Sequence, residues 1–151
     1  MAPAAAGVNG GAMRGRRVPP PRPRFTAPPG LDDIADLAER ALADIPQPLR
    51  GMVAGVSIQV EDFPDEATER DMGLESPFDL LGLYVGTPFG EQSVTESREH
   101  VDVIQLYRRP ILDYWCDSGE DLPHIVRHVL IHEIGHHFGF SDEDMERLEN
   151  E

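Results

Sequence analysis

Apolar residues recur with two different periods along the chain, and these periods predict its helices and strands. Helical spacing of apolar residues marks four segments, residues 31–45, 110–116, 122–138 and 143–149. Runs of β-branched and other apolar residues mark three strands, residues 53–60, 80–85 and 101–107. The polar, turn-rich stretches predict loops at 63–76 and 90–100. A first helix, three strands and then further helices predict an α+β domain, with a small sheet covered by helices.

The first 30 residues differ from the rest in composition. They hold seven of the 14 prolines and five arginines but no acidic residue. A Pro/Arg-rich segment of this kind buries too little apolar surface to offset its ordering entropy, so residues 1–30 predict a disordered tail. A basic arm that docks on a partner is the alternative. The folded domain is expected to span residues 31–151, with its first helix ending before Pro46.

Charge and composition narrow the class of protein. The 151-residue chain carries a net charge of -15, and residues 31–151 hold all 28 acidic side chains against eight arginines. So acidic a domain is expected to repel nucleic acid and anionic membranes. No apolar run reaches the roughly 18 residues of a membrane helix, and no secretory signal is evident. The single cysteine, Cys116, cannot form an internal disulfide, so no oxidising compartment is required and a cytoplasmic location is the default; its expected role is a small buried residue.

One segment carries recognisable chemistry: residues 132–142 spell H-E-x-x-H-x-x-G-x-x-D. Residues four apart share a helix face, so His132 and His136 can point two imidazoles at one metal ion. Gly139 can end the helix in the left-handed conformation, and the chain can then return the Asp142 carboxylate to the same ion. Two histidines and one carboxylate leave an open position, which is typical of catalytic zinc. Glu133 is the expected general base.

Other residues near the motif have weaker signals. His128 belongs to the same ladder of histidines and could support the site, although a half-exposed helix histidine is the simpler interpretation. Tyr107 or His128 could donate to the reaction oxyanion. A substrate strand could add to residues 103–107 through backbone hydrogen bonds, and Gln105→Pro would then abolish peptide binding; an ordinary sheet strand is the alternative.

The motif resembles that of the zincin metallopeptidases, in particular the small bacterial minimal zincins. The resemblance rests mainly on residues 122–142, and the third-ligand aspartate is also the one that snapalysin-type enzymes use. It implies a zincin-like domain built around the motif helix, zinc as cofactor, His132, His136 and Asp142 as ligands, and Glu133 as the catalytic residue. A metzincin-type Met-turn is not evident. The abundance of Arg without Lys, with much Ala, Gly and Pro, independently indicates a GC-rich bacterial genome.

These observations predict a zinc-dependent hydrolase that cleaves a peptide or protein substrate. Metal-activated water would attack the scissile carbonyl, and Glu133 would take and return its proton. A zinc-binding interaction or regulatory module is the alternative, and a non-peptidase hydrolase is another. Glu133 favours an enzyme, because a binding module has no use for a general base. The oligomeric state and the natural substrate stay open at this point.

Overall fold

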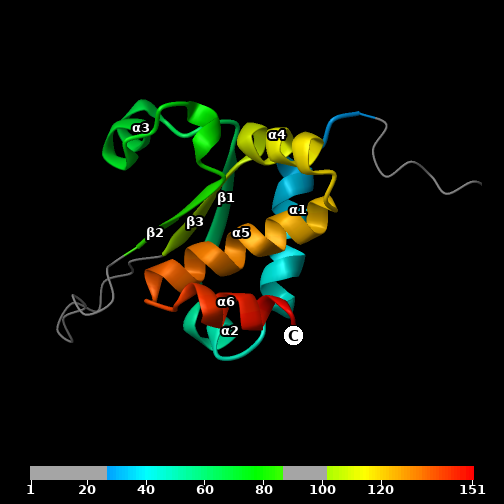
Figure 1. The fold of residues 1–151 in the computed structure, drawn as a ribbon, viewed down its shortest axis with the longest axis vertical. Helices are drawn as coiled ribbons and strands as arrows, with labels where there is room; N and C mark the ends of the chain where they lie inside the picture. The colour runs from blue at the N-terminus through cyan, green and yellow to red at the C-terminus, as the bar shows by residue number, and fades with distance from the viewer. Residues whose placement is uncertain (1–26, 87–101) are drawn as a thin grey trace, which may run out of the picture.

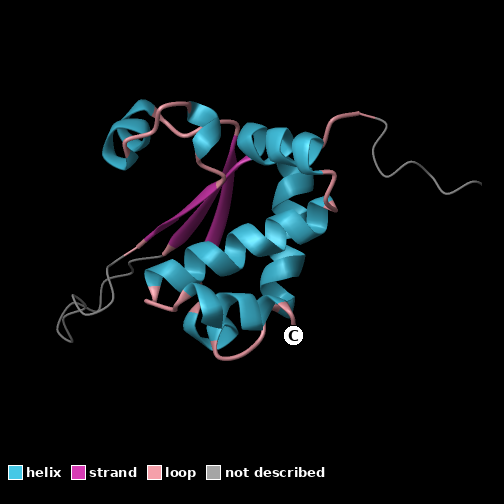
Figure 2. Ribbon diagram, in the orientation of Figure 1, coloured by secondary structure: helices cyan, strands magenta, loops and turns pink. Residues whose placement is uncertain are grey.

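The computed structural model describes residues 27–86 and 102–151. The predicted tail, except for its last residues, and the whole of the predicted connection at 90–100 lie outside the described residues. Within them, short strands and helices form a small sheet with helices packed around it (Figures 1 and 2). This is the α+β class that the sequence predicts. No described helix is long and apolar enough to cross a membrane.

The described residues form a three-stranded mixed sheet. Its strands are β1 (Ser57–Glu61), β2 (Gly82–Val85) and β3 (Val103–Tyr107), in the spatial order β1-β3-β2. β3 pairs with β1 in parallel and with β2 antiparallel. The prediction that residues 103–107 offer an edge to a substrate is therefore wrong, because β3 is hydrogen-bonded on both sides. Among the described residues, the unpaired edge nearer the motif belongs to β2, which contacts the motif helix.

The helices cover the sheet and supply most of the core. Their bounds are α1 (Leu31–Asp44), α2 (Leu49–Met52), α3 (Glu66–Met72), α4 (Arg108–Ser118), α5 (Leu122–His137) and α6 (Asp142–Glu149), with a short 3-10 helix, η1 (Pro77–Asp79). α1 begins at the residue that its apolar spacing indicates. α4 is longer than predicted, and Cys116 lies exposed on it, so the expectation of a buried cysteine is wrong. Its buried residues, Pro110 and Ile111, lie in the first turn of the helix.

The loop predicted at 63–76 contains the helix α3, so that prediction is also wrong, and η1 follows directly after it. α3 has no buried residue, which is why no hydrophobic period marks it. Its ends carry the signal instead: the Asp65 carboxylate accepts a 2.7 Å hydrogen bond from the Thr68 backbone N–H, and Gly73 adopts a left-handed φ of 63°. α3 is thus stabilised by the caps at its two ends and not by burial of an apolar face.

α5 is the central helix, and its core residues are buried on several sides. Ile125, Val126, Leu130 and Ile134 are at most 2% exposed. α5 packs on α1 and on β2. At Gly82 the approach of β2 is so close that an added Cβ would lie 2.7 Å from Val129 Cγ1. A helix packed in this way holds its polar residues in fixed positions beside β2.

α6 is fixed against the end of α5 by a sharp turn. Gly139, with a φ of 78°, follows the last turn of α5, and the Ser141 hydroxyl caps α6 by accepting a hydrogen bond from the Asp144 N–H at 3.1 Å. Met145 is fully buried, and the two helices approach so closely that a Cβ at Gly135 would lie 2.7 Å from Met145 Cγ. The left-handed turn predicted at Gly139 is confirmed.

Candidate metal centre

A ladder of histidines runs along one side of α5, as their four-residue spacing requires. The ring centroids of His128 and His132 lie 4.0 Å apart, and those of His132 and His136 lie 5.8 Å apart. Their exposure differs: the His132 side chain is 27% exposed, against 48% for His128 and 57% for His136. His132 is therefore the most enclosed member and lies between the other two.

Two carboxylates of α6 face this ladder. α6 runs back along α5, so its first residue, Asp142, lies near His136 and its last, Glu149, lies further back along α5 (Figure 1). Asp142 Oδ1 is 3.7 Å from His136 Nε2. Glu149 Oε1 is 2.6 Å from His128 Nδ1 and 3.1 Å from His132 Nε2. Residues seven apart share a helix face, which is why both carboxylates point to α5.

The sequence pattern groups His132, His136 and Asp142 around one metal ion, whereas in the structure the two histidines lie next to different carboxylates. His136 faces Asp142, while His132 faces Glu149. Among the described residues, one group of three potential ligands has atoms within 4.8 Å of one another, and it consists of His128, His132 and Glu149. The assignment of His132, His136 and Asp142 as one ligand set stays a prediction. Glu149 was missed, and its only signal is its spacing of seven residues after Asp142.

Glu133 lies close both to His136 of the ladder and to Tyr84 of the edge strand β2. Its carboxylate accepts a hydrogen bond from the Tyr84 backbone N–H on β2. Burial raises the pKa of Glu133, while the nearby His136 and the Tyr84 N–H act in the opposite direction. The side chain predicted as general base is therefore enclosed between α5 and the edge strand. A carboxylate in such a position can hold or release a proton at a substrate bound to that edge.

Burial also favours the ligating form of His132. Burial is the main cause that lowers its pKa, and the neighbouring His128 adds to this effect, whereas Glu149 raises the pKa. A lower pKa keeps the imidazole neutral, and only the neutral imidazole binds a metal ion.

Two other residues named from the sequence have different surroundings. Tyr107 is 3% exposed. Burial raises the pKa of its hydroxyl, whereas a hydrogen bond with the Thr68 side chain of α3 lowers it. His137, which was expected to pack or lie at the surface, stacks on the Tyr84 ring with the centroids 3.9 Å apart. Tyr84 in turn donates a 2.7 Å hydrogen bond to Asp102 Oδ2. These contacts fix β2 against the end of α5.

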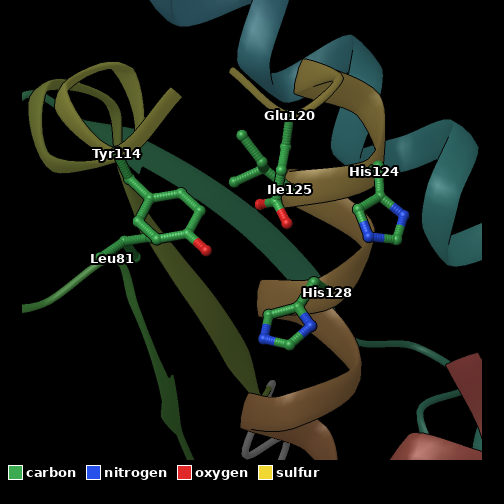
Figure 3. A pocket seen from close by; sticks show the side chains of 6 residues that line it. All are labelled: Leu81, Tyr114, Glu120, His124, Ile125 and His128. Carbon is green, nitrogen blue, oxygen red and sulfur yellow. The ribbon is translucent and has the colours of Figure 1, made fainter. Parts of the chain in front are cut away.

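A small cavity of about 180 Å³ opens beside the ladder (Figure 3). Its lining comes from α4, α5, the turn between them and the residue before β2, and comprises Leu81, Tyr114, Glu120, His124, Ile125 and His128. His128 is shared between this cavity and the group around Glu149. The mixed apolar and polar lining suits a side chain better than a charged ion.

The chemistry of the donors fits zinc. Imidazole nitrogens and carboxylate oxygens are the ligands of catalytic zinc sites. The histidine ladder of α5 and the two carboxylates of α6 together offer three imidazoles and two carboxylates. Glu149 Oε1 is buried and has no hydrogen-bond partner among the residues that the structure describes, although two imidazole nitrogens lie close to it. An unsatisfied buried carboxylate oxygen among imidazoles is the arrangement expected where a cation binds.

Comparison with known proteins agrees with this chemistry. Residues 53–151 match a family model described as "Zincin-like metallopeptidase". The match covers β1 to α6 and includes every residue of the histidine ladder and both carboxylates. No curated protein matches the chain.

Proposed function

Since the chain belongs to the zincin-like metallopeptidase family, we propose that it is a zinc-dependent hydrolase that cleaves peptide bonds. In this proposal zinc is held by His132, His136 and Asp142, and Glu133 is the general base. The observation that carries the proposal is the position of Glu133. Its carboxylate lies one residue beyond a histidine ligand yet faces the edge strand β2, whose Tyr84 N–H it contacts. A residue that only supported a metal would not need this position.

Zinc bound at these ligands would polarise a substrate carbonyl and activate a water molecule. The Glu133 carboxylate would accept the proton of that water and deliver it to the leaving amine. Its surroundings support this function, because α5 and β2 exclude bulk water from one side of the carboxylate. The fixed helix keeps Glu133 and the two histidines in a constant relative position, which general-base catalysis requires.

The substrate is proposed to lie extended along β2. The Tyr107 N–H donates to the Leu81 carbonyl at 3.0 Å, so the backbone groups of alternate residues, Gly82 and Tyr84, face away from β3. A peptide strand that paired with those groups would pass directly over Glu133. Its backbone would compete with Glu133 for the Tyr84 N–H, so substrate binding would free the carboxylate to act on water.

The test combines zinc content with peptide cleavage. We expect one zinc ion per native chain, loss of zinc in His132→Ala, and retention of zinc in Glu133→Gln. Cleavage of a mixed peptide library, followed by mass spectrometry, should fall by about 10²–10⁴-fold in Glu133→Gln, which is the usual contribution of a general base. Glu143→Gln, which changes an exposed carboxylate of α6, is the matched control.

The same assay separates the rival function. A native chain that binds zinc but cleaves no peptide of the library would favour the interaction module. Equal cleavage by the native chain and Glu133→Gln would refute the role of Glu133. Absence of zinc from the native chain after incubation with excess metal would refute the metal site itself.

A further inference from the structure

The group formed by His128, His132 and Glu149 is more enclosed than the predicted ligand pair further along α5. The Glu149 side chain is 15% exposed, whereas that of Asp142 is 92% exposed. Glu149 Oε1 has two imidazole nitrogens at 2.6 and 3.1 Å, yet within residues 27–86 and 102–151 it accepts no hydrogen bond. The lone-pair atoms therefore converge without an N–H directed at the oxygen. Burying such an oxygen without a partner is unfavourable unless something else occupies the centre of the group.

The position of Glu149 is held by its own helix and does not depend on the histidines. The Glu149 backbone carbonyl accepts a 3.0 Å hydrogen bond from Arg127 Nη1 of α5. Leu148 and Met145, on the same helix, are buried in the core. The end of α6 is thus held by a hydrogen bond to α5 and by two side chains buried in the core, and this packing keeps the carboxylate beside the ladder.

We propose that His128, His132 and Glu149 form a second zinc position, which competes with the His132, His136 and Asp142 position for His132. Two imidazoles and one carboxylate are a donor set that zinc accepts, with metal–ligand distances of about 2.0–2.2 Å. Tetrahedral ligands at these distances are separated by roughly 3.3–3.6 Å. The 3.1 Å between His132 and Glu149 nearly meets this separation. His128 is too close at 2.6 Å, but its half-exposed ring can move outward.

Competition follows from the position of His132. His132 Nε2 lies 3.1 Å from Glu149 Oε1, while the proposed catalytic set needs the same ring to face His136 and Asp142. One imidazole cannot ligate in both directions through one nitrogen, so a chain holds one ion at a time. The inference does not require peptide hydrolysis, because it concerns metal binding in a part of the ladder that excludes His136 and Asp142.

The decisive protein is the double variant His136→Asn/Asp142→Asn, which lacks the ligands of the first position. Metal-free protein is titrated with Co²⁺, observed by its visible absorption, and then with Zn²⁺ in competition. We expect this variant to bind one ion per chain. Adding Glu149→Gln should weaken binding by more than about 100-fold, since loss of a supporting partner alone costs about 10–100-fold. Glu146→Gln, an exposed carboxylate on the same helix, should leave binding unchanged.

Each outcome decides the proposal. A folded double variant, with an unchanged circular dichroism spectrum, that binds no ion would overturn it, and Glu149 would then be a positioning residue for His132. Binding that survives the addition of Glu149→Gln would overturn it as well. Two ions per native chain would refute competition for His132. Neither result depends on whether the native chain cleaves peptides, so failure here is distinguishable from failure of the proposed hydrolase.

Discussion

Gly135 lies inside the motif, between Ile134 and His136, and its lack of a side chain sets how closely α6 approaches α5. A Cβ at this position would lie 2.7 Å from Met145 Cγ and closer still to Met145 Sδ. Met145 is fully buried, so its side chain has no solvent into which to move. We therefore expect Gly135→Ala to destabilise the protein, although alanine is the better helix former.

Two opposing effects set the magnitude. Overpacking a closely packed core destabilises by about 1–3 kcal/mol. Replacing glycine by alanine within a helix stabilises by about 0.8–1.0 kcal/mol. The net effect of Gly135→Ala is a loss of about 0–2 kcal/mol in the free energy of unfolding. In a Met145→Ala background the clash is absent, so Gly135→Ala should stabilise by about 0.8–1.0 kcal/mol.

A double-mutant cycle measures this change of sign. The native chain, both single variants and the double variant are unfolded with urea in the presence of a chelator, so that metal binding does not contribute. Met145→Ala alone should cost about 2–5 kcal/mol. The coupling energy between the two sites should be about 1–3 kcal/mol. Effects that add to within about 0.5 kcal/mol would refute the contact between Gly135 and Met145.

Three further predictions concern β2 and α3. Gly82→Val should lower the thermal midpoint by several degrees, because its Cβ would clash with Val129, and an unchanged midpoint in calorimetry would contradict this close approach. Tyr84→Phe should destabilise the protein by about 1–2 kcal/mol in urea unfolding, because it removes the hydrogen bond to Asp102. If Tyr84→Phe costs the same free energy of unfolding in an Asp102→Asn background as in the native chain, this hydrogen bond is not the cause. The Thr68 N–H lowers the pKa of Asp65 below 3.8. The stability that this carboxylate contributes is therefore present above pH 3.8 and is lost as the pH falls through its lower folded pKa. The stability advantage of the native chain over Asp65→Asn should vanish in acid, and a difference that stays constant with pH would refute this.

The sequence predicts best those features that depend on local pattern. The span of α5, the left-handed turn at Gly139 and the α+β class all follow from periodicity and turn chemistry within short windows. The zincin-like resemblance followed from the same local motif, and the family match extends it from β1 to the end of the chain.

Features that depend on long-range pairing could not be predicted in this way. β3 has the composition of any half-buried strand, and only its pairing with β1 and β2 makes it central. α3 buries nothing, so its apolar period is absent although its caps are present. Glu149 has no motif of its own: its relation to His132 arises because α6 turns back along α5, and a turn of a few residues determines that direction.

The geometry of α6 links the two metal positions and extends the first prediction to function. Asp142 and Glu149 are separated by about 10.5 Å along the axis of α6, and the histidine ladder spans about 12 Å along α5. The match in length lets one antiparallel helix serve both ends of the ladder, but it also means that any displacement of α6 moves both carboxylates. Gly135→Ala should therefore weaken zinc binding although it removes no ligand, and Met145→Ala should restore the affinity of that variant. If Gly135→Ala lowers the free energy of unfolding but leaves the zinc affinity unchanged, the ladder binds metal without α6.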